Sequence, residues 1–171
     1  MSWRNQTHRT CPRCKKSKPV SDFRKRSGVT AAKENRIGQP YGWCKPCECV
    51  RRGESPRVFW QSSVFNIRKR AENKYVEFDL TPDSLLQLCK DQNMKCAITG
   101  RKLTFIAGKG RVHTNASVDR KETRGPYTIS NIRIVCDYAN AMRGDATDED
   151  FLDWCEDVLK TLGRHKPNKG T

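Results

Sequence analysis

The sequence has few acidic residues, few aromatic residues and no long apolar run. No segment approaches the ~18 consecutive apolar residues of a membrane-spanning helix, and residues 1–10 lack the apolar block of a secretory signal. Phe, Trp and Tyr make up 8% of the 171 residues, which disfavours recognition of single-stranded nucleic acid by base stacking. We therefore expect a cytoplasmic protein of one or two small domains with no membrane partner.

Basic residues dominate the first part of the chain. The sequence holds 34 Lys and Arg against 19 Asp and Glu, a net charge of +15. Residues 1–75 contain 19 of these cations and only 5 of the acidic residues, whereas residues 76–171 are close to neutral. Such a surplus predicts a polyanionic partner, and we expect double-stranded DNA. A basic region that is merely well solvated remains the alternative.

Nine cysteines are present, an odd number in a chain without a recognisable export signal. This argues against a disulfide framework and favours metal-binding thiols. Cys11 with Cys14, and Cys44 with Cys47, form two Cys-x-x-Cys pairs whose four thiolates suit tetrahedral Zn²⁺. We expect this zinc to be structural, because four thiolates leave no position for an activated water; redox dithiols are the alternative.

These pairs predict a basic, DNA-binding zinc ribbon over residues 1–52, followed by a basic helical connector over residues 53–75. In the connector, Trp60, Val64, Ile67 and Ala71 recur at helical spacing and predict one buried stripe. We also expect Phe65 in the core. The cations expected to contact DNA phosphates are Arg13, Lys15, Lys16, Lys18, Arg24, Lys25, Arg26, Arg68, Lys69 and Arg70.

The second half alternates between strand and helix patterns. Residues 112–119 alternate strictly between apolar and polar side chains and predict a strand that ends at Asp119. We expect a second strand at residues 132–135 and a short helix at residues 137–143. Strand, loop, strand and helix therefore follow one another within about 30 residues of chain.

Two further helices have recognisable ends. Thr81 and Thr147 are suited to cap their first turns, and Gly163 is suited to end the second helix. We expect residues 164–171, which follow this helix, to form a basic tail. The cysteines predicted to be buried thiols are Cys89, Cys96, Cys136 and Cys155.

Several segments occur in an order that is specific when taken together. They are residues 77–81 (EFDLT), 96–100 (CAITG), 116–120 (ASVDR), 125–127 (GPY), 131–132 (NI), 135–136 (VC), 140–145 (NAMRGD) and 151–155 (FLDWC). This ordered set resembles HNH endonucleases, especially those encoded by phages. The resemblance covers the chain from the connector to the last helix, and nucleases of this kind also carry N-terminal four-cysteine zinc modules.

The resemblance implies an α+β protein, a small zinc ribbon joined to a ββα-metal nuclease core over residues 76–163. It implies a metal-dependent endonuclease that hydrolyses or nicks phosphodiester bonds in double-stranded DNA. Asp119 and Asn140 match the two protein ligands of the catalytic Mg²⁺ or Mn²⁺, and their hard oxygens suit these ions. Asn131 matches the asparagine that braces the loop between the strands.

The chain departs from the family pattern at Arg120. This position usually holds the histidine that activates water, whereas a guanidinium stays protonated and is a poor base. Arg120 is still suited to polarise the phosphate. The sequence therefore leaves two further functions open. One is a catalytically impaired protein of the same fold that acts as a DNA- or protein-binding module or as an inhibitor of a host DNA enzyme, and the other is an RNA-binding zinc protein. The sequence also leaves open a homodimer and a host or phage DNA-processing protein as partner.

Overall fold

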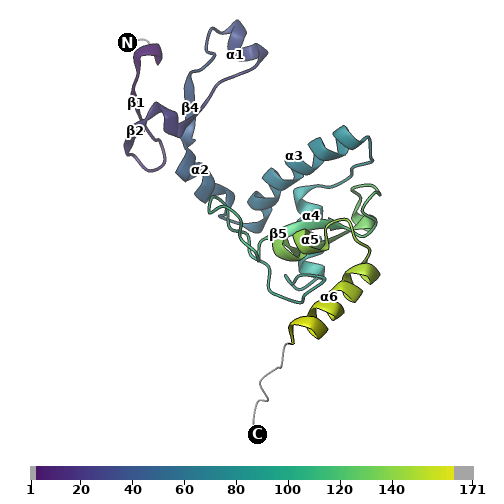
Figure 1. Ribbon diagram of the computed structural model, residues 1–171. Coiled ribbons are helices and arrows are strands. Elements are labelled where there is room, and N and C mark those ends of the chain that lie inside the picture. The colour runs from purple at the N-terminus through teal and green to yellow at the C-terminus, as the bar shows by residue number, and fades with distance from the viewer. Residues whose placement is uncertain (1–2, 164–171) are drawn as a thin grey trace. The chain divides into compact units, whose positions relative to one another are not determined.

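Residues 3–163 are described by a computed structural model, and they divide into two units of helices and small antiparallel sheets (Figure 1). The first unit comprises residues 3–59 together with Ile106–Gly110. The second comprises Trp60–Phe105 and residues 111–163. The mixture of helices with two-stranded sheets is of the α+β class, as the sequence predicts.

The first unit is built from short elements around a small core. In chain order these are η1 (Trp3–Asn5), β1 (His8–Thr10), β2 (Ser17–Pro19), η2 (Val20–Asp22), β3 (Phe23–Lys25), α1 (Val29–Lys33), β4 (Pro40–Cys44) and α2 (Lys45–Arg52). Strand β1 pairs with β2, and β3 pairs with β4. Cys11, Phe23 and Cys44 are the buried residues of the core. So few buried apolar side chains supply little free energy of folding, and domains of this size usually need a metal or disulfides.

The second unit contains a hairpin surrounded by helices. Its elements are α3 (Pro56–Lys74), which begins in the first unit, α4 (Pro82–Asp91), β5 (Ala116–Arg120), η3 (Ile129–Asn131), β6 (Ile132–Cys136), α5 (Asp137–Arg143) and α6 (Asp148–Leu162). The division between the units thus falls within α3, whose buried stripe is the predicted Trp60, Val64, Ile67 and Ala71. Most of this helix is part of the second unit's core rather than a connector beside it.

Strands β5 and β6 pair antiparallel, with Asp119 opposite Arg133, and α5 packs against both strands. On β6, the side chain of Gln92 exchanges two hydrogen bonds with the backbone of Ile134, at 2.9 Å from the Ile134 N–H and 2.7 Å to its carbonyl oxygen. Thr81 caps α4 as predicted: its Oγ1 accepts from the Ser84 N–H at 3.0 Å. Residues 132–136 and 137–143 therefore form the predicted second strand and short helix.

Three local expectations are wrong. Residues 112–115 form a turn, closed by the Asn115 N–H donating to the Val112 carbonyl at 3.0 Å, so β5 is only five residues long. His113 instead stacks its ring on Tyr138, with 4.5 Å between the ring centroids. Phe65 is 57% exposed rather than buried, with Lys69 above its ring. Cys155 is only partly buried, whereas Cys89, Cys96 and Cys136 are buried as expected.

Helix α6 begins and ends where its sequence predicts. Thr147 Oγ1 accepts from the Asp150 N–H at 3.1 Å, and Gly163 ends the helix at a φ of 55°. None of its residues is buried. The predicted basic tail, residues 164–171, lies outside the residues that the structure describes. Of the helices within residues 3–163, none has the length and apolar character needed to cross a lipid bilayer.

Candidate functional site

The four cysteines of the two Cys-x-x-Cys pairs come together in the first unit. One ligand atom from each of Cys11, Cys14, Cys44 and Cys47 lies within 4.8 Å of every other. Cys44 ends β4 and precedes α2, so the helix start brings Cys47 back toward it. The Cys44 N–H also donates to Cys11 Sγ at 3.4 Å. Four sulfur donors at this spacing fit a tetrahedral zinc ion.

The protonation of these thiols supports the same interpretation. Burial raises the pKa of Cys11, but the backbone N–H groups of Cys44, Cys14 and Arg13 outweigh it and lower the pKa to about 6. Burial and the other three thiols raise the pKa of Cys47 to about 12. A set of thiols that cannot all ionise next to one another needs a cation to neutralise the thiolates.

A related arrangement recurs in the second unit with only two cysteines. Cys136 ends β6 and precedes α5, as Cys44 does for α2, and Cys96 Sγ accepts from the Thr99 N–H at 3.4 Å. Thr99 and Ala139 occupy the positions that correspond to Cys14 and Cys47. Within residues 3–163, the only group of three or more potential metal-ligating side chains is the four-cysteine cluster.

Among the cations of the first unit that are predicted to bind phosphate, some are paired with other protein groups and others are not. Arg13 donates to the Cys47 carbonyl at 3.0 Å, pairs with Glu54 and lies over the Trp43 ring, so it stabilises the zinc module. Arg24 and Lys25 instead line an open hollow of about 640 Å³. Its other lining residues are Ser21, Phe23, Ser27, Tyr41 and Lys45.

In the second unit, the hairpin and α5 bring Asp119 and Asn140 to one small hollow of about 140 Å³. Asp119 comes from the end of β5 and is 3% exposed. Asn140 Nδ2 donates to Ser117 Oγ at 2.7 Å and to the Val118 carbonyl at 3.3 Å. These bonds fix the carboxamide, and its Oδ1 accepts no hydrogen bond from residues 3–163.

Both oxygens of Asp119 accept hydrogen bonds from arginines. Arg133 Nε donates to Oδ2 at 2.8 Å, and Arg143 Nη1 donates to Oδ1 at 2.9 Å. The same arginines bind Asp148, through Arg133 Nη1 at 2.6 Å and Arg143 Nε at 2.9 Å. Each carboxylate oxygen has a second lone pair, so Asp119 retains capacity for another ligand. Sequence reasoning missed both arginines, although they lie on the predicted strand and helix.

Arg120 also lines this hollow, and two contacts fix the position of its guanidinium. Its Nη1 donates to the Gly125 carbonyl at 2.8 Å, and its guanidinium lies 4.5 Å from the centroid of the Tyr127 ring. Asn131 braces the loop before it, since Nδ2 donates to the Pro126 carbonyl at 2.8 Å and Oδ1 accepts from the Glu122 N–H at 3.0 Å. A Cβ on Gly125 would lie only 2.7 Å from Asn131 Nδ2, so this approach requires glycine.

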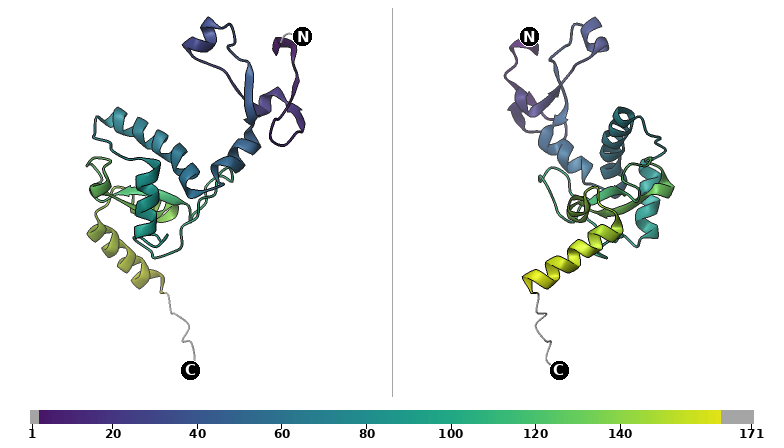
Figure 2. Two further views of the ribbon diagram at one scale, coloured as in Figure 1. Left: turned by 180° about the vertical axis from the view of Figure 1, so that it is seen from behind. Right: turned by 45° about the vertical axis from the view of Figure 1, so that its right-hand side comes forward.

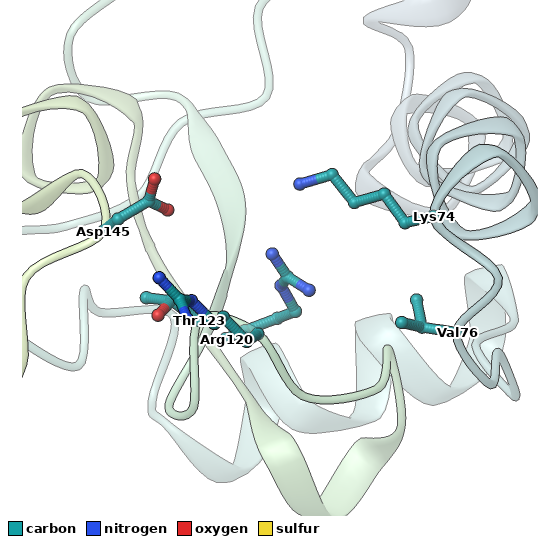
Figure 3. A pocket seen from close by; sticks show the side chains of 6 residues that line it. Lys74, Val76, Arg120, Thr123 and Asp145 are labelled. Atoms are coloured by element: carbon teal, nitrogen blue, oxygen red, sulfur yellow. The ribbon is translucent and has the colours of Figure 1, made fainter.

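A second, larger hollow of about 380 Å³ adjoins the first, since both are lined by Arg120, Thr123 and Asp145. Lys74 and Asp145 extend toward each other from its opposite sides (Figure 3). Arg124 lines this hollow, and Arg70 lines the first one. Within residues 3–163, Lys74, Arg124 and Asp145 form no ion pair. The sequence alone assigned no role to any of these three residues, although Asp145 ends the segment 140–145 (NAMRGD).

Comparison with known proteins adds one structural likeness. No protein-family model matches the chain. No curated protein matches it either. Among solved structures, the chain is similar to one reported as the rare-cutting HNH restriction endonuclease PacI, with 16% identity and a TM-score of 0.40, over 89% of this chain and 94% of that one.

Proposed function

We propose that this protein is a metal-dependent endonuclease of the HNH type that hydrolyses phosphodiester bonds in double-stranded DNA. The observation that carries the proposal is that Asp119 and Asn140, 21 positions apart in the sequence, line one hollow next to Arg70 and Arg120. An oxygen-donor pair beside two cations is suited to a divalent ion and a phosphodiester at the same time.

In this proposal Asp119 and Asn140 Oδ1 hold Mg²⁺ or Mn²⁺. When bound, the ion neutralises charge on the scissile phosphate and stabilises the leaving oxygen. Arg120 and Arg70 hold the phosphate oxygens, and the contacts of Arg120 with Gly125 and Tyr127 keep its guanidinium in place. Asn131 is a positioning residue, because it acts through the loop it braces.

Arg120 stays protonated and is not suited to remove a proton from water. Asp145 is the carboxylate that we place beside the attacking water. It lines both hollows and forms no hydrogen bond or ion pair within residues 3–163. A carboxylate with free lone pairs can orient a water molecule and accept its proton.

Each unit also presents, among its described residues, unpaired cations of its own. Lys74 and Arg124 line the adjoining hollow, and Arg24 and Lys25 line the open hollow of the first unit. None of these four is tied up in an ion pair within the described residues, which leaves them available for phosphates along a duplex. The four-cysteine zinc, in this proposal, stabilises the fold that presents the second pair.

The direct test is nicking of supercoiled plasmid with Mg²⁺ or Mn²⁺, using the intact zinc-loaded chain. Asn140→Ala should abolish nicking, whereas Asn73→Ala, an exposed asparagine of α3, should leave it unchanged. Binding of the same DNA should survive in both variants. If clean wild-type protein nicks no form of DNA with either ion, the nuclease proposal is wrong.

The second candidate function is a DNA-binding module with the same fold and no cleavage. The guanidinium of Arg120 and the two arginines on Asp119 favour it, because nearby cations oppose binding of a divalent ion. The plasmid assay separates the two: the module binds DNA in gel-shift titrations but leaves the plasmid supercoiled. A chain that prefers duplex RNA in the same titrations would instead be the RNA-binding zinc protein.

A further inference from the structure

The hairpin of β3 and β4 in the first unit ends in a tip, residues 26–39, that lies outside the zinc core. In the views of Figures 1 and 2, α1 lies at the far end of this hairpin from α2. Of residues 26–39 only Ala31 is buried, whereas the core consists of Cys11, Phe23 and Cys44. The tip therefore contributes little to the stability of the zinc module. Exposed loops held on a stable scaffold often carry binding residues.

The tip is nevertheless held in one conformation by backbone hydrogen bonds. The Arg26 N–H donates to the Gln39 carbonyl and the Gly38 N–H donates to the Arg26 carbonyl, both at 2.9 Å. Further along, the Arg36 N–H donates to the Ala31 carbonyl at 2.8 Å. A surface that is already ordered loses less conformational entropy when it binds a partner.

The charge of the hairpin indicates a polyanionic partner. Residues 24–38 hold five Lys and Arg and one Glu. Lys33 is exposed, and its ammonium group forms no ion pair within residues 3–163. Arg36 pairs with Glu34 at 3.4 Å, but both side chains are nearly half exposed, at 48% and 46%. An ion pair this open to water contributes little free energy, so both groups can exchange it for contacts with a partner.

The tip is not only cationic. Val29 is 73% exposed and Ile37 is 59% exposed. A surface that contacts phosphates alone needs only cations and hydrogen-bond donors. A combination of cations, one carboxylate and apolar side chains instead matches the edges of base pairs, which present acceptors, donors and the thymine methyl group.

The base of the same hairpin is suited to hold the sugar-phosphate backbone. Arg24, Lys25 and Lys45 line the open hollow of about 640 Å³. Three hydroxyl groups, those of Ser21, Ser27 and Tyr41, line it too. Backbone contacts of this kind fix the register of a protein on a duplex, and the side chains within the groove then read the sequence.

We propose that the tip of this hairpin enters the major groove of duplex DNA, where Arg36 and Lys33 contact base edges. The groove is about 12 Å wide and admits a two-stranded ribbon. Arg36 is suited to bind O6 and N7 of a guanine, and the hollow at the base of the hairpin takes a phosphate. Duplex RNA does not fit, because its major groove is deep and narrow. This inference rests on the duplex DNA of the proposed function, but not on its cleavage.

The first test is selection of bound sequences from a randomised duplex library. It uses the intact zinc-loaded chain without Mg²⁺ or Mn²⁺, so that no strand is cut. The wild type should enrich a motif that contains a guanine, and Arg36→Ala should lower the preference for this guanine by roughly tenfold. Lys33→Ala should relax the preference at another position.

The matched control is Lys16→Ala, which removes one exposed cation of the same unit outside the hairpin. It should weaken binding to all sequences alike and leave the motif unchanged, because a phosphate contact carries no sequence information. All three variants should still bind one zinc, since none of the changes touches the core. A wild type that enriches no motif overturns the proposal, and so does an Arg36→Ala variant that behaves like Lys16→Ala.

The second test identifies the groove and the contact. Replacing the selected guanine with 7-deazaguanine removes the N7 acceptor from the major groove and leaves Watson–Crick pairing intact. Binding of the wild type should weaken severalfold, whereas Arg36→Ala should be insensitive because its contact is already lost. Equal weakening of both proteins, or no weakening of the wild type, shows that Arg36 does not contact this base and overturns the proposal.

The groove proposal and the nuclease proposal fail separately. A chain that nicks plasmid but enriches no motif is a nuclease without a reading hairpin. A chain that reads a guanine through Arg36 but nicks no plasmid keeps the hairpin inference and loses the nuclease proposal. Tighter binding to duplex RNA than to duplex DNA overturns the hairpin inference, since the ribbon does not fit the RNA major groove.

Discussion

Asp119 and Asp148 are bound by the same two arginines, Arg133 and Arg143. The four side chains form a closed ring of two carboxylates and two guanidiniums that joins β5, β6, α5 and α6. Arg143 is fully buried in this ring, and it also donates to the carbonyl oxygens of Arg120 and Lys121. The ring therefore sets both the position of Asp119 and the path of the chain through Arg120.

Asp119→Ala should lower the free energy of unfolding by about 3 kcal/mol, because it removes one of the two carboxylates that pair with the buried guanidinium of Arg143. Asp119→Asn should cost less, since the carboxamide oxygen still accepts one hydrogen bond. Urea denaturation followed by circular dichroism measures both. Asp145→Ala, at an exposed carboxylate without an ion pair within residues 3–163, should change stability by less than about 0.5 kcal/mol. Equal stability of Asp119→Ala and Asp145→Ala would show that the ring contributes nothing.

This expectation affects how cleavage data are interpreted. Loss of nicking in Asp119→Ala can come from a lost metal ligand or from a displaced hairpin. Asn140→Ala removes only the bonds to Ser117 and Val118. It is the cleaner test of metal binding, and a folded Asn140→Ala variant with full nicking activity would exclude Asn140 as a ligand.

Stability should fall in acid as Asp148 becomes protonated. The hydrogen bond from Arg133 is the main cause that lowers the pKa of Asp148 from 3.8 to about 2. A carboxylate with a lowered folded-state pKa stabilises the protein fully above its ordinary pKa and loses this contribution as the pH falls toward the folded value. Asp148→Asn should therefore flatten the decline in unfolding free energy between pH 4 and pH 2. An unchanged acid profile in this variant would show that the ring does not depend on Asp148.

Removal of zinc should unfold the first unit and spare the second. The first unit has a core of only Cys11, Phe23 and Cys44, with partly buried neighbours, so without the ion little remains to hold it together. Metal analysis should give one zinc per chain, and Cys14→Ser should abolish it. Hydrogen exchange should then become fast over residues 3–52 while β5, β6 and α5 stay protected. Retained protection of β3 and β4 in metal-free protein would show that the cluster is not structural.

The sequence predicts the parts of this fold that depend on local chemistry. A Cys-x-x-Cys spacing, a Thr-Pro helix start and a helical apolar stripe each act within a few residues, and the structure has all three. Alternation over residues 112–119 did not make a full strand, because residues 112–115 close a turn instead. The pattern is also compatible with a turn, and only β6, which pairs with residues 116–120, selects where the strand begins.

The candidate site was predictable only in part, because some of its residues are brought together by tertiary packing rather than by local sequence. Asp119, Arg120 and Asn140 follow from an ordered set of segments along the chain. Lys74 lies in no such segment, and Asp145 ends one of them without any sign of a role. Both residues line one hollow only because α3 and the segment after α5 fold next to the hairpin. The binding of Asp119 by two arginines depends likewise on cross-strand register and on the place where α6 begins.

Lys74 and Arg124 should contribute to DNA affinity through phosphate contacts without affecting the fold. Both are exposed, both line the larger hollow, and neither forms an ion pair within residues 3–163. Each phosphate contact that is lost should lower the slope of log K against log salt by about 0.9, so the double variant Lys74→Ala/Arg124→Ala should lose roughly 2 in slope. Fluorescence anisotropy with a labelled duplex at several salt concentrations measures this slope. The matched control, Lys90→Ala/Arg101→Ala, removes two exposed cations elsewhere in the second unit and should leave the slope unchanged. If both double variants lose the same amount, the hollow has no special part in binding, and affinity comes from net charge alone.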